Sequence, residues 1–187
     1  MRSLLISLLA LLASSAAAAA APAQWTVDQA KSKLGFHVTA NGQAVDGVFP
    51  SFAAQIAFDP ADLAHSTIKV AVDMTGAQSG NATRDAMLPL PAWFDAKQFP
   101  KAQFDATSIT AKGGDKYEAA GTLSLKGVSK PVVLPFTLTI TGNTAHAVGE
   151  TSIKRLDFGI GQGKDYAPPT LALDVKVTVD LTAARKP

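Results

Sequence analysis

The chain has 187 residues and no cysteine, and its 17 lysine and arginine residues are nearly balanced by 15 aspartate and glutamate residues. The missing cysteine excludes disulfides, thiolate chemistry, cysteine metal sites and a lipid anchor on an N-terminal cysteine. The balanced charge, with no basic stripe along the chain, argues against a nucleic-acid partner.

The first 23 residues have the pattern of a secretory signal peptide. Arg2 gives a short basic start, an apolar run follows, and small residues lead to Ala21-Pro22-Ala23, which fits a cleavage site before Gln24. The apolar run is too short and too rich in alanine for a membrane span. We therefore expect residues 1–23 to be removed, which leaves residues 24–187 as one exported domain without a stable membrane anchor.

Most of the mature chain alternates between apolar and polar residues, which is the period of strands with one dry face. Extended stretches are expected over residues 25–38, 45–58, 68–74, 104–109, 117–125, 132–141, 145–153 and 171–182. Turn signals separate them at Asn41-Gly42, Asp59-Pro60, residues 113–115 and Gly142-Asn143. Eight strands joined mostly by short turns predict an all-β, eight-stranded antiparallel up-and-down barrel, with a two-sheet sandwich as second choice.

Three prolines restrict how the predicted strands can pair. Pro50-Ser51 separates Phe49 from Phe52 and predicts a bulge that restores the phase of its strand. Pro131 and Pro135 lie in the hairpin expected over residues 121–141 and have no N–H to donate. Each must therefore lie at a strand start, an edge or a bulge.

Residues 76–100 interrupt the strand pattern with a short helical insert near residues 81–95. Asn81 is placed to cap a helix over residues 83–88, which the following prolines end. A dense aromatic group comes next: Trp93, Phe94 and Phe99. Such an insert can cover and gate one end of a barrel.

No catalytic or metal-binding constellation stands out. His37, His65 and His146 are scattered, and two of them fall on the polar phase, which favours solvated side chains. Ser129 lacks the setting of a nucleophile elbow, and the glycines of residues 159–163 favour a mobile turn over a dinucleotide loop. We expect neither an enzyme nor a metal site, and no cofactor.

The sequence resembles the YceI-like family of lipocalin-like, polyisoprenoid-binding periplasmic proteins over essentially its whole mature length. The sharpest matches are Gly121-x-Leu123-x-Leu125-x-Gly127-Val128-x-Lys130-Pro131-Val132 and Arg84-Asp85-x-x-Leu88, followed by Phe94, Pro100 and Phe104. It departs from the family at Lys31, where a histidine is common, and over residues 164–170. The resemblance implies an eight-stranded barrel that holds an isoprenoid chain in the periplasm of a Gram-negative bacterium.

The inward-facing apolar residues have two interpretations, since eight strands leave room for packed side chains or for one small ligand. Small residues over positions 145–149 favour ligand room. The expected apolar lining is Phe36, Phe49, Phe52, Phe58, Trp93, Phe94, Phe104, Leu123, Leu125, Phe136, Leu138, Ala147, Phe158 and Ile160. Arg84, which could instead form an exposed pair with Asp85, and Arg155 are the candidate contacts for a polar head group.

Two functions follow from these alternatives. The first is an exported, soluble carrier of a long apolar molecule, with an isoprenoid quinone or polyprenyl lipid bound as ligand rather than as cofactor. The second is a periplasmic stress-response or interaction protein with a packed, ligand-free barrel, whose partner surface is residues 76–100. A homodimer is left open in either case.

Overall fold

The structure is a computed structural model that describes residues 21–187. The predicted signal peptide lies outside the described residues except for its last three positions, so its cleavage stays a prediction. The elements are β1 (Gln24–Val27), η1 (Gln29–Lys31), β2 (Lys33–Ala40), β3 (Gln43–Val48), β4 (Phe52–Ala57), β5 (Thr67–Asp73), α1 (Ala82–Met87), β6 (Lys101–Gly113), β7 (Lys116–Leu125), β8 (Val128–Thr141), β9 (Thr144–Lys154), η2 (Arg155–Phe158), η3 (Lys164–Tyr166) and β10 (Asp174–Arg185).

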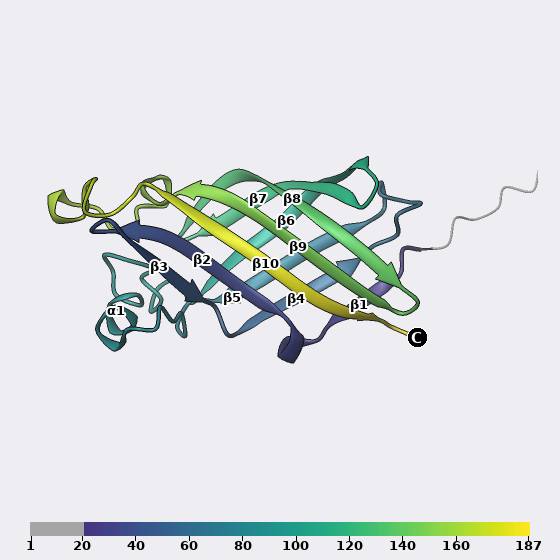
Figure 1. The fold of residues 1–187 in the computed structure, drawn as a ribbon, viewed down its shortest axis with the longest axis horizontal. Coiled ribbons are helices and arrows are strands. Elements are labelled where there is room, and N and C mark those ends of the chain that lie inside the picture. Colours follow the sequence, from purple (N-terminus) through teal and green to yellow (C-terminus); the bar gives the residue numbers. More distant parts are fainter. Residues whose placement is uncertain (1–20) are drawn as a thin grey trace, which may run out of the picture.

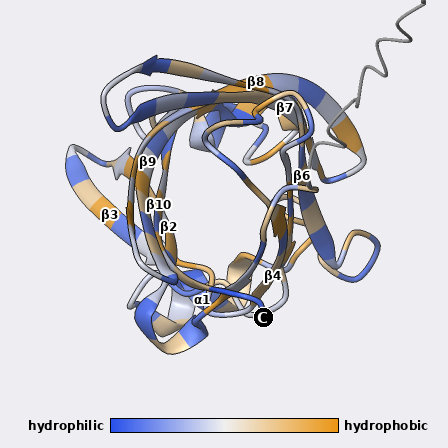
Figure 2. Ribbon diagram, turned by 90° about the vertical axis from the view of Figure 1, so that its right-hand side faces the viewer, coloured by the Kyte–Doolittle hydropathy of each residue, from blue (hydrophilic) through white to orange (hydrophobic). Residues whose placement is uncertain are grey.

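The strands form one antiparallel sheet in the order β1-β4-β5-β6-β7-β8-β9-β10-β2-β3, and an additional pairing of β1 with β10 closes it. Both β1 and β2 pair with β10, on either side of the short helix η1. Likewise β3 and β4 are two parts of one strand, broken at residues 49–51. The ten segments therefore make eight rows, and the predicted eight-stranded up-and-down barrel is confirmed (Figure 1). Figure 2, which looks along the barrel, shows the strands closing into a ring.

The tight turns form where the sequence predicts them. Asn41 and Gly42 adopt φ values of 50° and 73° between β2 and β3, as a two-residue hairpin turn requires. Lys126 and Gly127, with φ values of 51° and 75°, do the same between β7 and β8. Pro50-Ser51 was predicted to form a bulge within one strand, and the structure instead has a break there, between β3 and β4.

Three strands differ from their predicted bounds by three residues or more. β8 begins at Val128 instead of position 132, because residues 128–131 also pair with β7. β6 is longer than expected, because its alternation continues through polar residues on both sides of a register shift at Ala106. The last strand begins at Asp174 instead of position 171. Leu171 pairs only as an isolated bridge with Ala40, because the chain before β10 belongs to a long loop, residues 155–173.

The insert between β5 and β6 covers one end of the barrel, with α1 at the left of Figure 1. Asn81 caps α1 as predicted, since its side-chain oxygen accepts a hydrogen bond from the N–H of Arg84 at 3.1 Å. We call residues 74–100 together with the loop 155–173 the lid. No helix within residues 21–187 has the length and apolar character needed to cross a bilayer.

Buried apolar residues gather in two clusters. One joins the lid to the barrel and contains Met74, Phe94, Phe158 and Ile160, while the other contains Trp25, Phe58, Ile109 and Ala119. The three histidines lie on the surface as expected, each against an aspartate: His37 with Asp46, His65 with Asp62 and His146 with Asp180. Any cavity for a ligand must therefore lie in the barrel interior between the two clusters.

Candidate ligand-binding site

The barrel interior contains two adjoining apolar chambers. The lid chamber lies under the lid and measures about 350 Å³, and the floor chamber, toward β1, measures about 180 Å³. Binding pockets for small molecules typically measure about 300–1,000 Å³. The walls common to both chambers are Leu34, Val72, Leu123, Ile153 and Val177. These shared walls form a waist, so the two chambers together offer an elongated space rather than a round one.

Strand residues build the walls of the floor chamber, and an aromatic group closes its end. The indole N–H of Trp25 donates a hydrogen bond of 3.0 Å to the carbonyl of Phe58. The ring of Phe58 meets Tyr117 edge-on at 5.5 Å, and Tyr117 stacks on Phe136 at 5.6 Å. These contacts fix the rings at the β1 end, because aromatic pairs at such distances are favourable beyond their burial alone.

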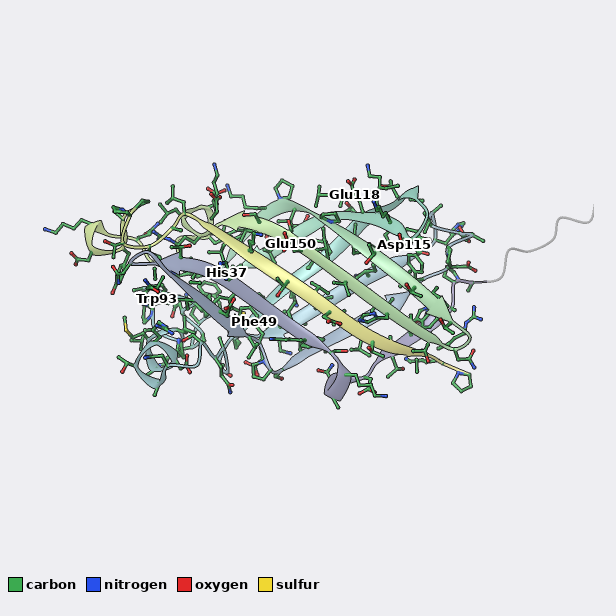
Figure 3. The ribbon with its side chains drawn as sticks, in the orientation of Figure 1. His37, Phe49, Trp93, Asp115, Glu118 and Glu150 are labelled. Carbon is green, nitrogen blue, oxygen red and sulfur yellow. The ribbon has the colours of Figure 1, made fainter. Side chains whose placement is uncertain are left out.

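Aromatic residues from the barrel and the lid meet in the lid chamber. Phe36 and Phe49 lie 5.3 Å apart, and Phe49 lies 6.1 Å from Phe94. Trp93 packs edge-on against Tyr166 at 5.0 Å, which joins the two segments of the lid. Figure 3 shows Trp93 near this end of the molecule and Phe49 further along the barrel. The prediction that the insert covers one barrel end is therefore confirmed.

Arg155, predicted as a head-group contact, lines the lid chamber but directs its donors into the loop 155–173. Its side chain is buried, with 2% of the residue exposed. Nε donates to the carbonyl of Ala172 at 2.8 Å, and the remaining N–H groups donate to the carbonyls of Ile160, Gly161, Tyr166 and Leu171. Burial lowers the pKa of the guanidinium from its ordinary value. All five donors of the arginine are thus used to hold the loop 155–173.

Arg84 keeps one side toward the lid chamber, which it lines. Its Nε donates to the hydroxyl of Ser79 at 3.1 Å, and Nη2 donates to the carbonyl of the same residue at 3.2 Å. Ser79 in turn donates its hydroxyl and its N–H to Asp85, each at 2.6 Å. Arg84 and Asp85 therefore do not form the expected direct pair, because both bond to Ser79, and this network orients an arginine that also lines the chamber.

Lys126 ties the β7–β8 turn to the lid. Its ammonium group donates a hydrogen bond of 2.7 Å to the carbonyl of Gly159. Burial lowers the pKa of Lys126, and the nearby charge of Asp95 opposes that shift. A side chain on Gly127 would meet the ring of Phe99 at 2.8 Å. Glycine is therefore required at position 127 of the matched motif, because the lid residue Phe99 packs directly against it.

The small residues expected to leave ligand room divide into two kinds. Ala145 and Ala147 line the floor chamber. A Cβ atom on Gly149, however, would lie 2.6 Å from the carbonyl oxygen of Pro135 and 2.9 Å from Cβ of Phe136. The expectation was wrong for Gly149, because this glycine admits the neighbouring strand rather than a ligand.

With one exception, the predicted apolar lining residues line one chamber or both. Phe158 is the exception, since it is 2% exposed and belongs to the packed cluster behind the chamber wall. The waist residue Val177 was missed, although it lies in the longest run of perfect alternation. Tyr166 was missed because nothing in the sequence of its loop indicates an inward position.

Comparisons with known proteins agree on the family to which this chain is related. A family model described as the YceI-like domain matches residues 25–183. A UPF0312 protein of Vibrio parahaemolyticus is 31% identical over 147 residues, which cover 74% of this chain and 78% of that protein. The crystal structure of Burkholderia cenocepacia BcnA superposes with a TM-score of 0.81 at 32% identity, covering 84% of this chain and 99% of that one. A polyisoprenoid-binding domain from Saccharophagus degradans has the same fold, with a TM-score of 0.70 at 12% identity over 88% of this chain and 99% of that one.

Proposed function

The chain belongs to the YceI-like domain family, and from this premise we propose that it is an exported, soluble carrier that binds one long-chain isoprenoid or similar amphiphilic lipid. The observation that carries the proposal is the pair of adjoining chambers, whose walls are almost entirely apolar. The name of the Saccharophagus degradans domain is in keeping with this class of ligand. Export to the periplasm is proposed from the signal-peptide pattern of residues 1–23.

The tail of the lipid supplies most of the binding free energy. Burying a methylene group contributes about 0.8 kcal/mol, so one five-carbon unit contributes about 3–4 kcal/mol before the ordering costs of ligand and protein. A solvent-exposed ion pair at the chamber edge contributes only about 0–1 kcal/mol. The protein therefore selects for a long apolar chain and discriminates weakly among head groups.

The polar end of the ligand belongs in the lid chamber. Its walls include Asn41, Arg84, Tyr166 and Thr170, whereas the uncharged polar residues in the lining of the floor chamber are Gln103 and Thr151. An amphiphile bound with its tail beyond the waist keeps its methylene groups on apolar walls. Its head group then lies within reach of donors and acceptors at the edge of the lid chamber.

A binding protein, rather than an enzyme, agrees with the side chains that face the chambers. The acidic and basic groups among the wall residues are Arg84, Arg155 and Asp165. Arg155 is occupied by loop carbonyls, and Arg84 is bound to Ser79. The alternative of a packed, ligand-free barrel requires side chains that meet across the axis, and the two chambers argue against it.

The proposal is tested by recovering the ligand from protein expressed with its own N-terminal segment. We expect organic extraction and mass spectrometry of the purified periplasmic protein to give a long-chain isoprenoid in near-stoichiometric amount. Ala147→Phe, which fills the floor chamber, is the matched control and should carry much less. Repeated recovery of no apolar molecule from the folded wild-type protein would overturn the carrier function.

A further inference from the structure

Packed side chains and hydrogen bonds narrow both ends of the barrel, although Ile140 of the floor chamber is 37% exposed. At the lid, the N–H of Gly161 donates to the carbonyl of Ala92 at 2.8 Å, and Trp93 packs on Tyr166. At the floor, the indole of Trp25 is bonded to Phe58. A long molecule needs a passage into the interior, and an interruption in the strand pairing of the side wall is a candidate for it.

The side wall has a seam between β8 and β9. The ladder between these two strands pairs Phe136–Thr141 with Thr144–Gly149 and stops at Phe136 and Gly149. Both strands continue beyond this point, β8 back to Val128 and β9 on to Lys154. Over the same residues β8 remains paired with β7, and β9 remains paired with β10. The two halves of the wall are thus complete, while the stretch between them has no backbone ladder among the described residues.

Two prolines explain why the ladder stops. The two-residue turn after Thr141 makes Thr141 and Thr144 a hydrogen-bonded pair, so the odd-numbered residues of β8 direct their N–H and C=O groups toward β9. Positions 131 and 135 are odd-numbered and are both proline. Their missing N–H groups therefore fall on the seam, and the pairing with β7 is unaffected. This confirms the expectation that Pro131 and Pro135 lie at an edge.

Two side-chain hydrogen bonds lie at the seam: one crosses it, and the other lies beyond its end. The hydroxyl of Thr151 on β9 donates to the carbonyl of Val133 on β8 at 2.8 Å. The bond from Lys126 to the carbonyl of Gly159 lies beyond its open end. Within residues 21–187 only this one hydroxyl bond crosses the seam, so the two strands can part there at far lower cost than where a ladder of backbone bonds joins them.

The seam separates an outer surface of mixed character from the floor chamber. On its inner side Val132, Leu134, Thr151 and Ile153 all line that chamber. On its outer side the β8 edge is apolar, with Val133 49% exposed between two prolines, whereas the β9 edge presents Glu150, Ser152 and Lys154. A lipid tail that passes along the β8 edge stays in contact with apolar residues on both sides of the wall.

We propose that the seam between residues 128–135 of β8 and residues 150–154 of β9 is the lateral passage through which the lipid tail enters and leaves the barrel. This inference rests on the proposed carrier function and adds the route to it. The passage opens when the bond between Thr151 and Val133 breaks and the two strands separate, while both ends of the barrel keep their contacts. Seam opening then sets the rates of uptake and release, and the chamber walls set the affinity.

The test joins the two edges of the seam covalently. If the register of the ladder is continued, Val133 lies opposite Ser152, and both side chains point outward. Because the chain has no cysteine, Val133→Cys with Ser152→Cys introduces the two thiols of the protein. The matched control is Thr139→Cys with His146→Cys, an opposed pair in the intact ladder of the same two strands. Oxidation joins each pair, and a short bismaleimide is used where the thiols lie too far apart for a disulfide.

The probe is ubiquinone-2, which quenches Trp25 and Trp93 in the chamber walls. Stopped-flow fluorescence measures its uptake, and its release is measured by transfer to phosphatidylcholine vesicles. We expect the joined seam pair to slow both rates at least about tenfold with an unchanged Kd, and the joined control pair to leave both rates unchanged. A joined seam that exchanges the probe as fast as the open seam overturns the lateral passage but leaves the carrier function standing. Failure of the wild-type protein to bind the probe or extracted lipid counts against the carrier function itself.

A second variant tests the proline mechanism without a cross-link. Pro135→Val restores an N–H that can donate to the carbonyl of Glu150 and lengthen the ladder. Both exchange rates should fall severalfold, and hydrogen exchange should show a protected amide at position 135. Pro60→Val, in the turn after β4, is the control for a proline replacement away from the seam. A protected amide with unchanged rates would contradict the mechanism.

Discussion

The lid chamber and the floor chamber are shaped by different forces. The floor chamber is built by strand residues, and its end is closed by Trp25, Phe58 and Tyr117 packed against one another. The lid chamber is bounded by loops that hydrogen bonds hold in place. The donors are the buried guanidinium of Arg155 and the ammonium of Lys126, and both donate to loop carbonyls.

This difference separates what hydrophobic alternation can specify from what it cannot. Alternation decides which strand residues face inward, and it thereby builds a chamber wherever the inward side chains are too small to meet. A loop has no such period, and its carbonyls need partners once they are buried. In the lid those partners come largely from one side chain, so the floor should tolerate single substitutions better than the lid.

Replacing Arg155 with methionine should have the largest effect on stability. The change keeps a long apolar stem but removes hydrogen bonds to five carbonyls. Each buried carbonyl left without a partner costs about 1–3 kcal/mol, and water can satisfy some of them. We expect the free energy of unfolding, measured with urea, to fall by at least about 3 kcal/mol.

The control for this prediction is Lys176→Met, which removes an exposed ion pair with Glu150 of 3.2 Å. That change should cost at most about 1 kcal/mol. Hydrogen exchange of Arg155→Met should rise chiefly within residues 155–173 and leave the floor unchanged. A loss of less than about 1 kcal/mol for Arg155→Met would mean that the loop does not depend on this residue.

The sequence predicts the floor better than the lid for the same physical reason. Phe58, Phe136 and Ala147 were placed on the chamber wall from the strand period alone, and the structure puts them there. Arg155 was expected at a head group, because a charged residue near a barrel mouth suggests a ligand contact. Nothing in the sequence shows that the carbonyls of residues 160–172 turn toward it.

Only part of the seam could be predicted from the sequence. The sequence shows that Pro131 and Pro135 cannot donate to a neighbouring strand, so each was expected at a start, an edge or a bulge. Which neighbour loses its ladder depends on the turn at Gly142-Asn143, which fixes the phase of β8 against β9. That phase is a property of the hairpin and cannot be read from either proline.

Two neighbouring substitutions on β9 should separate chamber space from strand packing. Gly149→Ala places a methyl group against the backbone of Pro135, so we expect a loss of about 1–3 kcal/mol in stability. Ala147→Phe enters the floor chamber, so stability should change by less than about 1 kcal/mol while the Kd for ubiquinone-2 rises at least about tenfold. Urea unfolding and fluorescence titration measure the two quantities. A large stability loss for Ala147→Phe would show that the floor chamber is already filled.

Trp93→Ala tests whether the lid contributes contacts or a passage. Trp93 lines the lid chamber and packs on Tyr166. If the lid stays closed during exchange, lost contacts should raise the release rate of ubiquinone-2 severalfold and leave the uptake rate nearly unchanged. Quenching of the remaining Trp25 reports both rates. Uptake and release that rise together by tenfold or more would restore the expected gating by residues 76–100 and contradict the lateral passage.

The smallest effect is expected at Asp73, where the floor-side strand β5 passes into the lid. Its carboxylate accepts hydrogen bonds from the hydroxyl of Thr75 at 2.6 Å and from the N–H of the same residue at 2.8 Å. These two bonds lower the pKa of Asp73 below its ordinary value, the hydroxyl bond more than the N–H bond. Because the folded state holds the proton less tightly than the unfolded state, the stabilisation is present above the unfolded value of about 3.9 and is lost as the pH falls through the folded pKa.

Asp73→Asn should therefore destabilise the protein by a few tenths to about 1 kcal/mol near neutral pH, since the site is partly solvated. The difference from wild type should shrink as the pH is lowered below about 4, because the wild-type carboxylate is then protonated and loses the same advantage. Urea unfolding at several pH values measures it, and Thr75→Val, which removes the hydroxyl bond alone, should lose part of the same difference. A difference that stays constant down to pH 2 would mean that the carboxylate charge does not contribute, and that the passage from β5 into the lid is fixed by backbone bonds such as that from Met74 to Pro100.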